Sequence, residues 1–120
     1  CAQAVLGAYV DLFDLEMDQA MTIAYGFGGG VGMTREICGT LTGGAMALGL
    51  KYGKGEADVK QKKFVNEKVS ALCKEFEASH GSVICGELLG IRKTDKEVNR
   101  ATCDDLIEEV VRLLEKYLVD

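Results

Sequence analysis

The stretch of sequence that decides the fold is TREICGTLTGGAMALGLKY, residues 34–52. Thr34 is a good helix N-cap, and Glu36 in the first turn suits the positive end of the helix dipole. The longest apolar run in the chain lies here and has 14 residues, whereas a membrane span needs about 20. These residues therefore predict a buried helix that runs to about Tyr52 and does not cross a membrane.

This helix is unusual for its four glycines, each of which costs about 1 kcal/mol of helix stability relative to alanine. They are Gly39, Gly43, Gly44 and Gly49. Gly39, Gly43 and Ala47 follow one another at intervals of four residues, so they form a stripe without large side chains. Such a stripe lets another backbone approach closely. We expect a neighbouring helix of the same core to pack there, and a homodimer contact is the alternative.

Glycines and polar residues mark the ends of the other expected helices. The run GFGGGVG, residues 26–32, predicts a glycine-rich loop before the third helix. Gly53 and Gly55, on either side of Lys54, are expected to end that helix. The other helices are expected at residues 2–13, after a cap at Asp14 or Asp18, at residues 56–80, at residues 82–89 with Ser82 as cap, and after a cap at Thr102.

The composition favours a single helical domain over residues 1–120. Proline is absent, although an average chain of this length has roughly six, so nothing interrupts long helices. Hydrophobic residues make up 48% of the chain and charged residues 28%, as in soluble globular proteins. We predict an all-α fold, a compact bundle of five or six helices.

Charge and targeting signals limit the classes of function. The net charge of −5 and the lack of a basic cluster argue against nucleic-acid binding. No secretory signal is recognisable, and we expect a cytoplasmic protein. The chain begins with Cys1 rather than methionine, so a preceding segment outside this sequence is an open alternative.

Four of the five cysteines are expected where helices begin, namely Cys1, Cys38, Cys85 and Cys103. Unpaired N–H groups and the dipole at a helix start favour the thiolate, which is both the nucleophile and the metal ligand. Cys73 differs, because it lies in the middle of an apolar helix face, where cysteine acts as a small hydrophobic residue. We predict that the four helix-start cysteines share one site.

Local motifs leave the chemistry of that site open. No C-x-x-C pair occurs, so the thioredoxin-like and zinc-ribbon signatures fail. The glycine loop does not fit a dinucleotide-binding loop, because Met33 occupies the position of the third glycine. Four cysteines can pair in three ways, and the sequence does not choose among them.

The segments that carry a family resemblance are Cys1 with the residues after it, CGTLTG at residues 38–43, CGELLG at residues 85–90, and Cys103. In order and spacing they resemble a family of redox-active proteins named for its cysteine pattern, C_GCAxxG_C_C. Thr40 stands where the family motif has alanine. The resemblance implies that these four cysteines are the family's own and that Cys73 is extra. It also implies a small bacterial protein, often encoded near transporter genes.

Three functions follow from these residues. The first is thiol–disulfide redox chemistry by Cys1, Cys38, Cys85 and Cys103, with Cys38 paired to Cys85 or to Cys1. The second is a Cys₄ site in which the same residues hold zinc or an iron–sulfur cluster. The third is a helical interaction module whose cysteines only pack. The redox function implies a redox protein as partner, and the family resemblance implies a transporter-associated protein as the alternative.

Overall fold

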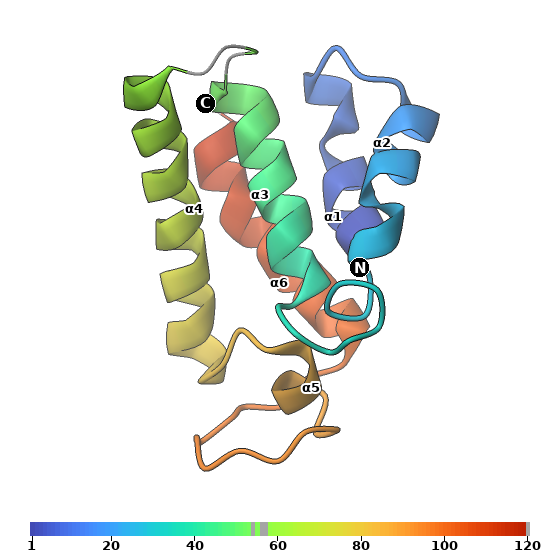
Figure 1. Cartoon of the computed structure of the whole chain (residues 1–120), viewed down its shortest axis with the longest axis vertical. Coiled ribbons are helices and arrows are strands. Elements are labelled where there is room, and N and C mark those ends of the chain that lie inside the picture. The colour runs from blue at the N-terminus through green and yellow to red at the C-terminus, as the bar shows by residue number, and fades with distance from the viewer. Residues whose placement is uncertain (54, 56–57, 120) are drawn as a thin grey trace.

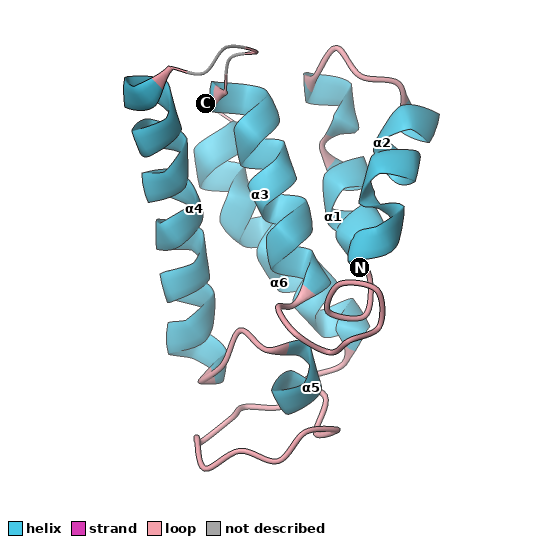
Figure 2. Ribbon diagram, viewed as in Figure 1, coloured by secondary structure: helices cyan, strands magenta, loops and turns pink. Residues whose placement is uncertain are grey.

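The computed structural model describes residues 1–53, 55 and 58–119. The described residues form six α-helices and no named strand (Figure 2), which confirms the expected all-α fold. The helices are α1 (Ala2–Ala8), α2 (Met17–Ala24), α3 (Gly39–Tyr52), α4 (Val59–His80), α5 (Cys85–Leu88) and α6 (Cys103–Leu118). Two 3₁₀ turns, Val10–Leu12 and Tyr25–Phe27, follow α1 and α2. Lys54 and the expected helix start at Glu56 lie outside the described residues. None of the described helices is long and apolar enough to cross a bilayer.

Three helices begin at the same end of the molecule. Figure 1 shows α1, α3 and α6 starting there and running in the same direction, while α4 returns in the opposite direction beside α3. The short helix α5 and the irregular segment after it close this end. Large apolar side chains from these helices fill the space between them. The fully buried ones include Leu6, Leu41, Leu48, Leu72, Phe76, Val110 and Leu114.

The small-residue stripe on α3 packs against the start of α1, which confirms the expected helix partner within the same core. A Cβ atom added to Gly43 would lie 2.6 Å from the carbonyl oxygen of Ala2 and 3.2 Å from the Cβ of Val5. A Cβ atom added to Gly39 would lie 2.3 Å from the Sγ of Cys1. Glycine at these positions therefore lets α1 approach and leaves room for the sulfur of Cys1.

The expected start of the glycine-containing helix was wrong by four residues. Cys38, not Thr34, is the N-cap of α3, and the Thr34 hydroxyl instead donates to the carbonyl oxygen of Gly30 at 2.8 Å. Glu36 likewise lies before the helix and pairs with Arg92. The physical reason is a run of left-handed backbone over residues 29–33, in which even the non-glycine residue Val31 has a φ of 71°.

Other helix ends differ less from expectation. Thr102 caps α6 and Gly81 ends α4 in the left-handed conformation, both as expected. The first helix ends earlier, at Ala8, because the chain tightens into a 3₁₀ turn. Glu16 is the N-cap of α2 in place of Asp14 or Asp18, and its N–H donates to the side chain of Gln19. Ile84 is the N-cap of α5, and Ser82 acts from outside the helix by accepting the N–H of Ile84.

Candidate functional site

The shared direction of α1, α3 and α6 brings four cysteines together at one end of the molecule. Cys1 and Cys38 are the N-cap residues of α1 and α3. Cys85 and Cys103 are the first residues of α5 and α6. All four line one cavity of about 230 Å³. Cys73 lies elsewhere, half-buried on α4 and packed against the core.

The rest of the cavity wall is mostly apolar. Its other lining residues are Gly29, Met33, Arg35, Gly39, Thr40, Leu89 and Leu106. The four thiols differ in their access to solvent: Cys38 and Cys85 are buried, Cys1 is half-buried and Cys103 is exposed. The arrangement therefore has an inner, buried pair of thiols and an outer, more accessible pair around one cavity.

An isolated antiparallel bridge between Ile37 and Ile84 positions the inner pair. The N–H of Cys38 donates to the carbonyl oxygen of Val83 at 2.8 Å, and the N–H of Cys85 donates to that of Glu36 at 2.5 Å. Each cysteine follows a bridged residue, so both side chains leave the bridge on the same face. Such diagonal neighbours lie about 7–8 Å apart, and their Cβ atoms lie closer. A disulfide requires Cα atoms within about 7 Å, so the bridge brings the two cysteines close to the range in which a disulfide can form.

A local sequence repeat underlies this geometry. The pattern Ile-Cys-Gly-x-Leu-x-Gly occurs at residues 37–43 and again at residues 84–90, and the bridge joins the two copies at their first residues. The first glycine of each copy, Gly39 or Gly86, leaves room for a neighbouring residue of the site. Gly39 accommodates Cys1, whereas a Cβ atom on Gly86 would lie 3.2 Å from the Cβ of Arg35. The repeat is visible in the sequence alone, and it is a signal from which the contact between its two copies could have been predicted.

Arg35 is the only charged side chain among the described residues that line the cavity. Its Nη1 lies 3.7 Å from the Sγ of Cys85, to which it donates. The backbone of Arg35 has a left-handed φ of 63°, and both its N–H group and its carbonyl oxygen form hydrogen bonds. Its N–H donates to Gly29 at 2.9 Å, and its carbonyl oxygen accepts the N–H of Gly86 at 3.0 Å. Sequence reasoning missed Arg35, since its approach to Cys85 depends on this unusual loop.

Cys38 lies in a different electrostatic environment from the one expected at a helix start. Burial raises the pKa of the Cys38 thiol above its ordinary value, and negative charge on Cys85 acts in the same direction. The Thr40 hydroxyl, 2.9 Å from the Cys38 Sγ, and two backbone N–H groups lower that pKa by less. Desolvation therefore outweighs the helix start, and neutral Cys38 is favoured.

We expect alkylation of Cys38 in the folded, reduced protein to require a higher pH than alkylation of the same residue in the unfolded chain. The raised pKa keeps Cys38 protonated to a higher pH in the folded state. The stabilisation of the folded protein that comes from this raised pKa is fully present below the pKa of the Cys38 thiol in the unfolded chain. It is lost as pH rises through the higher pKa of the same thiol in the folded protein. Mass-spectrometric mapping of iodoacetamide adducts against pH, with and without urea, measures this shift. Equal profiles in both states would contradict it.

The described residues contain no group of three or more cysteine, histidine, aspartate or glutamate side chains placed to hold a metal ion. All five cysteines are free thiols. The geometry thus places the four sulfurs around one cavity without bonding any of them to another.

Comparison with known proteins finds one relationship. No curated protein and no solved structure matches the chain. A family model does match residues 1–117, and its description is "Putative redox-active protein (C_GCAxxG_C_C)". This match covers nearly the whole chain and includes all four cysteines of the cavity. The chain therefore belongs to the C_GCAxxG_C_C family.

Proposed function

We propose that this protein is a thiol–disulfide redox protein in which Cys38 and Cys85 form the redox couple. The observation that carries the proposal is the placement of four thiols around one cavity, with these two on the same face of the Ile37–Ile84 bridge. In the reaction the dithiol gives two electrons and two protons to a substrate disulfide. The substrate becomes two thiols, and the protein gains one disulfide.

The environments of the two thiols suggest separate roles. Thiol–disulfide exchange begins with attack by a thiolate. Cys85 is the better candidate for that attack, because the Arg35 guanidinium offers a positive charge and a hydrogen bond to its sulfur. Cys38, whose pKa is raised by burial, is then the resolving thiol that attacks the mixed disulfide. In this scheme Cys1 and Cys103 form an outer pair that can exchange with the inner disulfide.

The test is an anaerobic titration of the reduced wild-type protein with a small disulfide, followed by peptide mapping. We expect the first two-electron oxidation to remove two thiols and to link Cys38 to Cys85, while Cys73 stays reduced. A first disulfide between other cavity cysteines would show that our pairing is wrong. A protein that forms only mixed disulfides, or whose oxidation does not distinguish Cys73, would contradict the redox proposal itself.

A Cys₄ zinc or iron–sulfur site is the second candidate, and the shared cavity is the observation that favours it. Cys1, Cys38, Cys85 and Cys103 would be the ligands, since thiolates suit both zinc and iron–sulfur clusters. The described side chains would have to move closer together, because no three of them form a group that could hold a metal ion. Metal analysis and visible absorption of anaerobically purified protein decide between the two candidates. Stoichiometric metal that protects all four thiols from alkylation would favour the metal site.

A further inference from the structure

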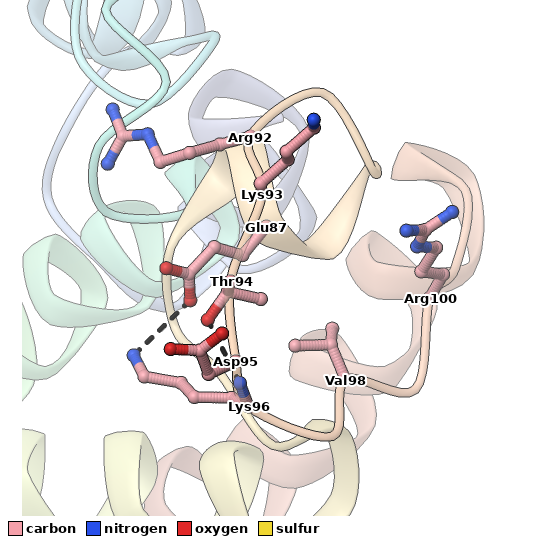
Figure 3. Close-up of a pocket in the computed structure, with 8 residues that line it drawn as sticks. All are labelled: Glu87, Arg92, Lys93, Thr94, Asp95, Lys96, Val98 and Arg100. Atoms are coloured by element: carbon pink, nitrogen blue, oxygen red, sulfur yellow. Dashed lines mark hydrogen bonds and ion pairs between the residues drawn. The ribbon is translucent and has the colours of Figure 1, made fainter.

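A second pocket, of about 500 Å³, is formed largely by the segment that joins α5 to α6 (Figure 3). Four cationic side chains line it, namely Arg92, Lys93, Lys96 and Arg100, together with the carboxylates of Glu87 and Asp95. Residues 91–102 contain four basic and two acidic residues, a local charge of +2 in a chain whose net charge is −5. The pocket is therefore a basic site on an otherwise acidic protein.

Two of the four cations remain available to a ligand. Arg92 pairs with Glu36 at 2.9 Å, and Lys96 pairs with Glu87 at 3.2 Å. Within the described part of the chain, no carboxylate pairs with Lys93 or Arg100. Figure 3 shows Arg100 across the pocket from the Glu87–Lys96 pair. An anionic ligand would supply the partner that these two side chains lack.

The basic pocket adjoins the cysteine cavity through Gly90. A Cβ atom on Gly90, whose φ is 77°, would lie 3.0 Å from the Cζ of Arg100. The guanidinium therefore lies directly against this glycine, and the preceding residue, Leu89, lines the cysteine cavity. Cys103, the exposed thiol of that cavity, follows Arg100 by three residues. Arg92 in turn has a raised pKa, to which Glu36 contributes most and negative charge on Cys85 contributes the least.

Backbone contacts hold the segment in this position. The N–H of Asn99 donates to the carbonyl oxygen of His80 at 2.8 Å, and the N–H of Ala101 donates to that of Leu88 at 3.4 Å. The His80 ring also contacts the Asn99 carbonyl oxygen at 3.0 Å and the carboxylate of Glu109. Arg100 lies between the two anchored residues, so its place at the junction of the two pockets is part of the fold.

We propose that the basic pocket binds the carboxylate groups of a small organic disulfide and thereby delivers its sulfur atoms to the cysteine cavity. The volume is typical of small-molecule sites, and a guanidinium such as that of Arg100 can bind a carboxylate with two parallel hydrogen bonds. This inference rests on the proposed redox function and adds the substrate class. One protein thiolate breaks the substrate S–S bond and releases the first thiol after protonation. The second protein thiolate then breaks the mixed disulfide and releases the second thiol, leaving one protein disulfide.

The test compares three disulfide probes at low ionic strength: 5,5′-dithiobis(2-nitrobenzoate), which is anionic, 4,4′-dithiodipyridine, which is uncharged, and cystamine, which is cationic. The rate of intramolecular disulfide formation is measured for the wild type and for the double variant Lys93→Gln with Arg100→Gln. The matched control is Lys60→Gln with Lys63→Gln on α4, which removes the same charge from exposed positions outside both pockets. Comparing each variant with the wild type for one probe cancels the intrinsic reactivity of that probe.

We expect the pocket variant to lose about five-fold or more in rate with the anionic probe, as for the loss of about 1 kcal/mol of charge interaction. Its rate with the uncharged probe should stay the same, which also shows that the site is still folded. The control variant should leave both rates unchanged. Equal losses in the pocket and control variants, or no loss in either, would overturn the inference while leaving the redox function intact. If no probe produced an intramolecular disulfide in the wild type, the redox proposal would fail and this inference with it.

Discussion

Replacing Gly43 with alanine is expected to lower the free energy of unfolding by about 1–3 kcal/mol, the usual cost of overpacking a core. The new Cβ would lie 2.6 Å from the carbonyl oxygen of Ala2 and 3.1 Å from its Cα. Both atoms belong to the backbone of α1, so no side chain can rotate to relieve the clash. The loss should appear although alanine is intrinsically better than glycine in a helix by about 1 kcal/mol. Urea unfolding of the reduced protein measures the difference.

Gly49 provides the matched control on the same helix. Among the described residues, and apart from the backbone of its own helix, a Cβ atom at this position meets nothing within 4 Å, so Gly49→Ala should stabilise the protein by up to about 1 kcal/mol through helix propensity alone. Both substitutions add one methyl group to α3, and they differ only in the atoms that this methyl group would contact. If Gly43→Ala stabilised the protein as much as Gly49→Ala, α1 could not pack against α3 as the structure shows.

The presence of the helices and the small-residue stripe on α3 could be predicted from the sequence, because both depend on the local spacing of residues. Apolar residues recur with the period of a helix in α6, and Thr102 can cap it wherever the rest of the chain lies. Gly39 and Gly43 lower the stability of the helix, and close packing against another element can offset that loss. The residues alone therefore predicted that a second helix packs against this stripe. That α1 is this partner depends on the tertiary arrangement.

The conformation of the loop before α3 could not be predicted, because it depends on tertiary contacts. Val31, Met33 and Arg35 all have positive φ values, which their own propensities disfavour. Hydrogen bonds join residues 35, 36 and 38 at the end of this loop to residues 83, 85 and 86, which lie about fifty positions away in the sequence. The preference of threonine for the N-cap position therefore led to a predicted start of α3 at Thr34, which is too early.

That the four helix-start cysteines lie together could be predicted from the sequence, whereas their arrangement around the cavity and the place of Arg35 could not. The expectation that helix starts carry the cysteines led to the four residues that line the cavity. Which two thiols form the inner pair depends on the Ile37–Ile84 bridge, a contact between residues 47 positions apart. The direction of the Cys38 pKa shift also depends on burial, which no local pattern reveals.

Replacing Cys85 with serine is expected to reduce two-electron oxidation of the native protein to the background rate, the largest functional effect we predict. Serine keeps the size of the side chain and removes the sulfur that the Arg35 guanidinium contacts. Without an attacking thiolate, neither the mixed disulfide nor the protein disulfide can form by this route. Stopped-flow reaction with 4,4′-dithiodipyridine, followed by mass spectrometry of the quenched protein, measures both products.

The variant Cys38→Ser distinguishes the two roles, since it removes the resolving thiol and leaves the attacking one. We expect it to react with the probe and to accumulate a mixed disulfide on Cys85, because no buried thiol remains beside the bridge to release it. Cys73→Ser is the control: its thiol also has a pKa raised by burial but lies outside the cavity, so oxidation should match the wild type. Accumulation on Cys38 in the Cys85→Ser variant would reverse the roles, and release of the Cys85 adduct by Cys103 would make the outer pair the resolving one. Either result would keep the chemistry in the shared cavity, whereas oxidation that depended on Cys73 would move it elsewhere.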